Sequence, residues 1–466
     1  MNNRLSLTVC AVLIAHGYMS PAHAMSCNSG RGYVGTEGVG ALKSQGLWHP
    51  NGEAFRDNFT INTYAAASGS CMLADNLKAT ASGVLQYASS VREPGVLDGK
   101  QNSALAIATE AYLTYTPSEK VFIDIGKIKR SNGFMFSMNP LDLLRNTSGH
   151  PRSATVNADS NNPNSFYEEG SIGVGGTVYA DSGTFELAAL PKLTTNDSFR
   201  ESAEKWSMLE RTNSTNRFYG AFTTSKFSDF NPTVNMVAGS SYNALGLGVS
   251  GYVNDNLILS MESAVARGER WRHLNMEAAT AIQQYGNVGD PFGQNSRRLT
   301  ANLAVGLRYT DSSRTEYGIE YFGQTEGYSR SEWRNYFKTV RFVNGGFAAG
   351  LPTGLGASLA PLYGQYANLL AVETDNANRG NNFLGKHYIT LFASSKTEQL
   401  RKVGWSVSST TSLADGGTVL KANLSTSVSK NTVLHAGTSF SFGSQQSEFG
   451  QFGQRKTIYA GVRFVI

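Results

Sequence analysis

Long segments in which apolar and polar side chains strictly alternate recur along this chain. The final segment, 456–466, is one of them: Ile458, Ala460, Val462, Phe464 and Ile466 share one parity, and Arg463 lies on the other. The same period of two runs through 77–87, 298–309, 419–428 and 433–442. Period two predicts β-strands. Segments of about ten residues suit tilted membrane strands better than the shorter strands of soluble sandwiches.

The composition narrows the fold class further. Charged residues make up 16% of the chain, against about 25% in ordinary soluble domains. Glycine is abundant at 49 residues, aromatic residues reach 11%, and the mean hydropathy is -0.27. After residue 24 no apolar run approaches the ~18 residues of a membrane helix. We therefore predict an all-β fold, a single closed transmembrane antiparallel β-barrel.

The first 24 residues have the pattern of a secretory signal peptide. Arg4 precedes an apolar stretch, and Ala22-His23-Ala24 is a small-residue cleavage pattern. We expect residues 25–466 to form the barrel in the outer membrane of a Gram-negative cell.

Connection lengths give the strand count. Short connections such as 116–120, 181–183, 311–314 and 429–431 alternate with mostly longer ones, as between periplasmic turns and outer loops. The pattern predicts 18 strands, with 16 as the alternative, and both termini in the periplasm. The strands are expected near 31–41, 58–68, 77–90, 103–115, 121–129, 168–180, 183–192, 216–227, 232–240, 244–252, 256–267, 297–310, 314–327, 384–396, 400–412, 416–428, 431–443 and 456–466.

The last strand is expected to close the barrel against the first. An alternating C-terminal strand also resembles the signal read by the outer-membrane assembly machinery, which we expect as a partner. That signal usually ends in phenylalanine, whereas this chain ends in Ile466 with Phe464 two places before it.

Two cysteines remain after loss of the signal peptide. Cys27 is expected before the first strand and Cys71 after the second, at the periplasmic end of one hairpin. An even number of cysteines in an exported protein favours a disulfide, and two unpaired thiols are the alternative.

Strand parity places many charged side chains inside the barrel. On a lipid-facing side each Arg or Lys would cost ~2–4 kcal/mol near the bilayer midplane. These charges either form a selectivity ladder for charged solutes or neutralise one another within the wall, and we favour the second interpretation. The candidate pore-lining residues are Glu110, Asp124, Glu262, Arg298, Arg308, Glu316, Glu320, Lys402, Lys421, His435 and Arg463.

Two long loops are too apolar to lie only in water. The loop after Arg130 begins RSNGFMFSMNPLDLLRN, and we expect it to fold inward and narrow the lumen. A loop that caps its own barrel or contacts a neighbouring protomer is the alternative. The loop 331–383 is expected to pack as an inner constriction or lid. The constriction candidates are Phe134, Phe136, Asn139, Asp142 and Arg145.

The basic group Lys127, Lys129 and Arg130 is expected at the upper end of a strand. These residues would meet either a substrate or, as we favour, the phosphates of lipopolysaccharide. Lipid and lipopolysaccharide are the partners that this fold implies.

The segment 110–144 resembles Gram-negative outer-membrane porin-like families, alginate-export-type barrels included. The matching positions are Glu110, Ala111, Tyr112, Ile125, Gly126, Gly133, Asn139, Pro140, Asp142 and Leu143. The sequence departs from the pattern at Asn132, where tryptophan is usual, and at Lys127-Ile128, where Arg-Gln is common. The resemblance implies a barrel that passes solutes or polymers.

No enzymatic constellation is evident. His435 and Ser439 share a face but are four residues apart, about 13 Å at strand rise, too far for a base and its nucleophile. The sequence has no HExxH, phosphate-binding glycine loop or paired CxxC. We predict no enzyme, cofactor, metal site or nucleic-acid partner.

The sequence thus predicts a porin-like channel for small hydrophilic solutes, charged or uncharged. An export pore for a secreted polymer and a non-conducting structural or adhesive barrel are the alternatives. The oligomeric state and an exporter partner stay open.

Overall fold

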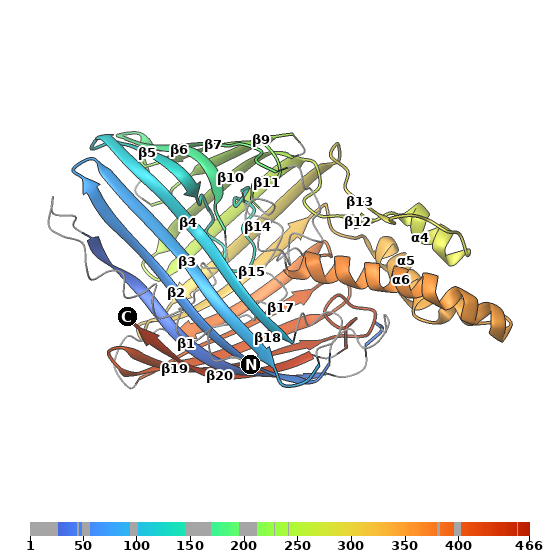
Figure 1. The fold of residues 1–466 in the computed structure, drawn as a ribbon. Helices are drawn as coiled ribbons and strands as arrows, with labels where there is room; N and C mark the ends of the chain where they lie inside the picture. The colour runs from blue at the N-terminus through green and yellow to red at the C-terminus, as the bar shows by residue number, and fades with distance from the viewer. Residues whose placement is uncertain are drawn as a thin grey trace.

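The protein is an 18-stranded antiparallel β-barrel, seen here in a computed structural model (Figure 1). The structure describes residues 27–43, 46–48, 56–93, 101–144, 169–194, 212–227, 229–240, 242–379, 383–395, 402–453 and 455–466. The signal peptide predicted over 1–24 lies outside them. The barrel strands are β1(Cys27–Lys43), β2(Asn58–Ala74), β3(Leu77–Ser90), β4(Asn102–Ser118), β5(Val121–Ile128), β6(Ser171–Ala180), β7(Gly183–Leu190), β8(Arg217–Thr224), β9(Thr233–Gly239), β10(Asn243–Asn254), β11(Leu257–Arg267), β14(Leu299–Thr310), β15(Thr315–Gln324), β16(His387–Ser395), β17(Val403–Ser412), β18(Thr418–Ser429), β19(Thr432–Phe442) and β20(Arg455–Val465).

The barrel closes through the first and last strands. β1 pairs with β2 on one side and with β20 on the other, from Tyr33↔Val465 to Lys43↔Arg455. Each of the other barrel strands pairs with its neighbours in sequence, so the predicted count of 18 is confirmed. Closure leaves no open sheet edge in the hydrocarbon, the condition for a sheet to span a membrane.

The outward face is apolar, as the alternation predicts. On β20, Ile458 and Phe464 are 56% and 48% exposed, and Ile466, directly after the strand, is 67% exposed, while Tyr459 and Arg463 are buried on the inner side. Ile319 on β15 and Leu391 on β16 are about half exposed in the same way. The terminal strand therefore presents its apolar side to lipid.

A disulfide joins Cys27 and Cys71 near the short turn between β2 and β3. Both cysteines lie within strands, because β1 begins at Cys27 and β2 continues to Ala74, further than the sequence indicated. The two are direct partners in the β1–β2 register, with Cα atoms 4.0 Å apart.

A β-bulge at Thr109 changes the facing of β4. Glu110 pairs with Ser82 and Ala108 with Gly83, which leaves Thr109 as an extra residue. Parity counted from the turn places Ile107 outside, but Ile107 is 2% exposed and packs inside against Val84 and Ala66. The inserted residue shifts the alternation by one, and this reverses the prediction for the first half of the strand.

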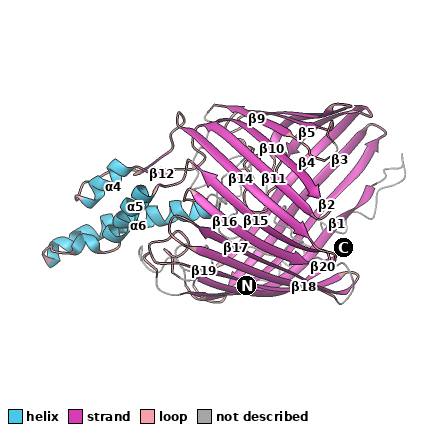
Figure 2. Ribbon diagram, turned by 180° about the vertical axis from the view of Figure 1, so that it is seen from behind, coloured by secondary structure: helices cyan, strands magenta, loops and turns pink. Residues whose placement is uncertain are grey.

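Helices extend from the end of the barrel opposite the C-terminus (Figures 1 and 2). The β11–β14 connection carries β12(His273–Leu274), α4(Met276–Gln283) and β13(Phe292–Gly293). The β15–β16 connection carries α5(Arg330–Val343), η2(Gly346–Ala348) and α6(Thr353–Arg379). The prediction that 331–383 folds inward as a constriction or lid is therefore wrong. Among the described residues, no helix is both long and apolar enough to cross a bilayer.

The helices have an apolar core of their own. Trp271, Trp333, Tyr336, Tyr363 and Leu370 are nearly fully buried in it. Trp48, from the β1–β2 connection, joins this cluster and stacks on Phe452 at 5.6 Å. This core explains why the helices lie outside the barrel. The apolar side chains of 331–383, which were expected to pack in the lumen, are buried among the helices instead.

Candidate pore constriction

The segment that follows β5, residues 129–144, folds back into the barrel. Its buried side chains, Met135, Met138, Leu141 and Leu143, contact inward-facing residues of the wall. The inward fold of this loop was expected from the same apolar residues. The loop lies inside the wall because of specific contacts to charged side chains and to wall glycines.

Glu262, at the middle of β11, holds two separate points of the loop. One carboxylate oxygen accepts a hydrogen bond from the Phe134 amide, and the other accepts one from the Leu141 amide at 3.1 Å. Asn235 of β9 donates to the Leu141 carbonyl at 3.0 Å. The wall thus replaces water as the partner of the loop's backbone groups.

Glu320, on β15, holds the tip of the loop. Its carboxylate accepts hydrogen bonds from the Phe136 amide at 2.6 Å, the Ser137 amide at 2.8 Å and the Ser137 hydroxyl at 2.7 Å. Arg308 on the adjacent β14 donates to the Phe134 carbonyl at 3.0 Å. Glu262, Glu320 and Arg308 do face the lumen, but they fasten the loop rather than stand free in the channel.

Glycines in β10 make room for the loop. A Cβ on Gly246 would lie 2.8 Å from Leu141 Cδ2, and one on Gly248 would clash with the same side chain. Both glycines have inward parity, so the wall is locally one side chain thinner, and Leu141 is 1% exposed there. Leu143 packs beside it against Tyr219, Val237 and Ala244.

Phe136 is the aromatic side chain that the loop presents to the lumen. It is 55% exposed, and its ring stacks on Phe392 of β16 with centroids 4.2 Å apart. On the other side of the loop, Met135 and Met138 pack against Phe322 and Tyr388. The loop thus contacts both the β9–β11 wall and the β14–β16 wall.

The other constriction candidates have supporting roles. Asn139 accepts the Met135 amide at 2.9 Å, and its carbonyl accepts the Asp142 amide at 3.1 Å. Asp142 is 8% exposed, within 3.4 Å of the Ser131 hydroxyl. Arg145 lies outside the described residues.

Next to the base of the loop, charges form a compact network. Arg130 lies 2.5 Å from Asp124 and 3.6 Å from Glu186, and Asp124 also accepts the Thr114 hydroxyl at 2.6 Å. Glu110 lies beside this network, near Lys129 and the Ser82 hydroxyl. These opposite charges compensate one another, in line with the structural interpretation of the inner charges.

The basic group at 127–130 is therefore not on the outer surface. Lys127 is 5% exposed and pairs with Glu169 at 2.7 Å, and Arg130 points to Asp124. The favoured expectation that this group meets lipopolysaccharide phosphates is wrong for these two side chains. Inward strand parity and the two acidic partners direct them into the barrel.

Strands β17–β20 form a second wall with a different character. Lys421 is exposed on their inner side between Ser408 and Ser439, and within the described residues it makes no ion pair. Toward the short-turn end of the barrel, His435 Nε2 lies 3.4 Å from Glu37 Oε2, across Gly461. Arg463 lies over the ring of Tyr33 at 5.2 Å.

Three predicted lining residues lie elsewhere or make no contact. Lys402 precedes β17 at the short-turn end and is exposed, so it is not in the wall. Arg298 lies at the long-loop end of the barrel, just before β14, where it pairs with Glu269 at 2.8 Å. Glu316 has inward parity on β15 but reaches no part of the loop among the described contacts.

The rim carboxylate Glu269 is held charged. Burial opposes this by raising its pKa, but hydrogen bonds from His273, the Asn295 amide and Arg298 outweigh burial. The resulting pKa is about 2.

The loop 443–453, between β19 and β20, is held against residues 384–388 through Glu448. This side chain is 1% exposed and accepts hydrogen bonds from the Tyr388 hydroxyl and, at 2.9 Å, from the Leu384 amide. Burial raises the pKa of Glu448 to about 8, and the nearby Asp415 acts in the same direction. Phe449 packs with Phe383 and Tyr388, which links this loop to the cluster around Met135.

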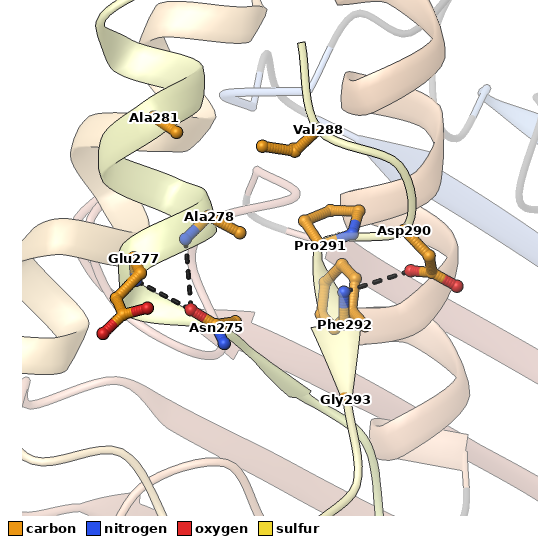
Figure 3. Close-up of a pocket in the computed structure, with 9 residues that line it drawn as sticks. All are labelled: Asn275, Glu277, Ala278, Ala281, Val288, Asp290, Pro291, Phe292 and Gly293. Atoms are coloured by element: carbon orange, nitrogen blue, oxygen red, sulfur yellow. Dashed lines mark hydrogen bonds between the residues drawn. The ribbon is translucent and has the colours of Figure 1, made fainter. Parts of the chain in front are cut away.

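A shallow pocket of about 390 Å³ lies outside the barrel, between α4 and the segment that leads into β13 (Figure 3). Asn275 there caps α4 by accepting the Glu277 and Ala278 amides, and Asp290 accepts the Phe292 amide and pairs with Arg272. Its polar groups serve the local fold, and its position among the helices keeps it off the lumen.

Several residues with contacts on the inner side of the barrel were not predicted as site residues. Strand parity predicts that the side chains of Glu37, Asn235 and Phe392 point inward. No sequence motif marks these three residues as part of a site. The signal for the loop groove was readable in LGLGVSG, where Gly246 and Gly248 recur with period two on the inward face.

No described protein family matches this chain, and no curated protein does. Solved structures with a similar course of the chain include OccK5 (OpdH) of Pseudomonas aeruginosa, at 8% identity and TM-score 0.46 over 94% of this chain and 98% of that one. OccAB2 of Acinetobacter baumannii is 10% identical, with a TM-score of 0.49 over 94% of this chain and 98% of that one. OprD of P. aeruginosa is 7% identical, with a TM-score of 0.45 over 94% of this chain and 95% of that one. At this level of similarity the function has to be argued from the chain's own residues.

Proposed function

We propose that this protein is an outer-membrane channel that passes small hydrophilic solutes through a wet lumen narrowed by the loop 129–144. The barrel of 18 strands supports the first part, because a barrel of this size is wide enough to hold an aqueous passage. Its apolar outer face and charged inner face are those of a membrane barrel with a polar interior.

The single observation that carries the proposal is the fastening of the loop by Glu262 and Glu320. Between them these two carboxylates accept five hydrogen bonds from the loop. A barrel that served only as a scaffold gains nothing from a fixed partition inside it. A loop held at a set position instead defines a cross-section, which favours small solutes over a bulky polymer.

Conductance of the purified full chain in planar bilayers tests this function. We expect stable open currents whose ion preference depends on the inner charges. Insertion without current would contradict the channel and leave the structural barrel as the function.

One observation favours an additional role at the cell surface. The helices α4, α5 and α6 have an extensive apolar core outside the barrel, which a simple diffusion channel does not need. A folded projection on the outer side is suited to contacts with other surface molecules.

A further inference from the structure

Helix α5 is strongly amphipathic and firmly placed. Ser329 and Glu332 form a capping box at its N-terminus, which satisfies backbone amides that have no helical partner. Its apolar side chains, Trp333, Tyr336, Phe337 and Val340, are buried in the helical core. The exposed surface of the helix is therefore held in a fixed orientation toward the surroundings.

On that exposed surface, beside the apolar face, lies a stripe of four cations: Arg330, Arg334, Lys338 and Arg341. Their spacings of four, four and three residues place them within an arc of about 80° at 100° per residue. From first to last the stripe spans about 16 Å of helix axis at 1.5 Å per residue. Within the part of the chain that the structure describes, none of the four makes an ion pair.

Among the described residues, no acidic side chain forms an ion pair with the stripe. Glu332 is the single carboxylate of α5, and it serves the capping box while lying near Lys386 and Arg298. The residues that follow, 342–372, contain no Asp, Glu, Lys, Arg or His. The positive charge is thus concentrated on this helix. On an ordinary solvated surface, positive and negative charges are mixed.

The stripe begins at the barrel rim. β15 ends at Gln324 and α5 starts at Arg330, so only five residues separate the barrel wall from the first cation. Two further exposed arginines lie at the same end of the neighbouring strands: Arg267 ends β11, and Arg297 precedes β14. Leu299, opposite Arg267 in the register, is 70% exposed on the lipid-facing side.

We propose that the basic face of α5, together with Arg267 and Arg297, binds the phosphorylated saccharide headgroups of lipopolysaccharide. Phosphates are the dense anionic groups at this depth of an outer membrane, and exposed Arg and Lys bind them by charge and hydrogen bonding. The inference rests on the outer-membrane location in the proposed function, but it does not depend on conductance.

The test uses the purified full chain in non-ionic detergent, titrated with lipopolysaccharide at low salt. In R330Q/R334Q/K338Q/R341Q we expect the affinity for lipopolysaccharide to fall at least tenfold. Each cation near an anionic surface contributes roughly a factor of five in affinity, so tenfold for four cations is a lower bound. The matched control is K120Q/K226Q/K402Q/K430Q, four exposed lysines at the short-turn end. That variant should bind as the wild type does.

Three results would overturn the proposal: equal losses in the two variants, unchanged binding in the α5 variant, or equal wild-type binding to dephosphorylated lipopolysaccharide. Heparin serves as a general polyanion, and tighter binding of heparin than of lipopolysaccharide would overturn the assignment as well. Unchanged tryptophan emission from Trp333 shows that the α5 variant keeps its fold. Bilayer conductance, measured separately, shows whether a failure belongs to the channel or only to this surface.

Discussion

Glu320 accepts hydrogen bonds from both the amide and the hydroxyl of Ser137, at 2.8 and 2.7 Å, although 183 residues separate the two in sequence. This contact holds the tip of the inward loop to β15. A charged side chain on the inner side of the wall thus fastens the loop that we propose as the constriction.

Replacing Glu320 with alanine should release the loop tip. Hydrogen bonds to a charged group contribute about 1.5–3 kcal/mol each, so losing three of them should lower the free energy of local opening by at least about 4.5 kcal/mol if the contributions add. We expect larger and noisier single-channel currents. Glu316→Ala on the same strand and face is the control, and an equal effect from it would show that the loop is not held by Glu320.

Filling the groove in β10 should displace the loop from the other side. Gly248→Val places a branched side chain where Leu141 now packs, and overpacking of this kind costs about 1–3 kcal/mol. Amide hydrogen exchange of residues 131–144 should become faster. The control is Gly176→Ala, in which the added Cβ would lie 3.6 Å from the nearest atom, the Phe122 carbonyl oxygen. Exchange of residues 131–144 should be unchanged in this variant. Faster exchange in the control as well would indicate a general loss of barrel stability.

Lys421 should contribute to ion preference, because it is exposed on the inner wall and has no ionic partner among the described residues. Lys421→Glu is expected to move the zero-current potential in a salt gradient toward cation preference. Lys402→Glu makes the same change of charge outside the wall and should have a smaller effect. Identical potentials for wild type and Lys421→Glu would exclude this lysine from the ion path.

The loop 443–453 should loosen as pH rises. The pKa of Glu448 is about 8 in the folded loop and near 4.5 when the loop opens. The folded form thus holds an extra proton between these values, and its stability falls as pH rises from about 4.5 to 8. Proteolysis of this loop should accelerate over that range in the wild type but not in Glu448→Gln. A pH-independent rate in the wild type would contradict the buried neutral carboxyl.

Glu269 should show the opposite sign. Its folded pKa of about 2 lies below the ordinary 4.5, so its contribution is present above pH 4.5 and is lost as pH falls toward 2. Acid titration of the emission from the adjacent Trp271 should therefore show a transition below pH 4.5. Glu269→Gln should remove that transition, and its persistence in the variant would assign it to another group.

The strands were predictable because each repeats one simple pattern. Ile458 to Ile466 must face lipid, and Glu262, Glu320 and Arg308 on other strands cannot. The facing of Ile107 was not predictable, since a bulge at Thr109 leaves no mark in the alternation. The partners of Glu320 were equally hidden, because no local pattern connects it to Ser137.

The helices could have been recognised. Ser329 and Glu332 have capping-box spacing, and Trp333, Tyr336, Phe337 and Val340 follow with helical period. The apolar content of 331–383 does not by itself distinguish a loop packed in the lumen from helices packed on one another.

Thiol modification at Phe136 tests most directly whether the loop lines the ion path. Cys27 and Cys71 are joined in a disulfide, so Phe136→Cys would carry the reactive thiol, and Ile319→Cys on the lipid-facing side of β15 is the control. A bulky thiol reagent should reduce the single-channel current of Phe136→Cys in one step and leave Ile319→Cys unchanged. Full modification of Phe136→Cys with no change in current would contradict a constriction formed by this loop.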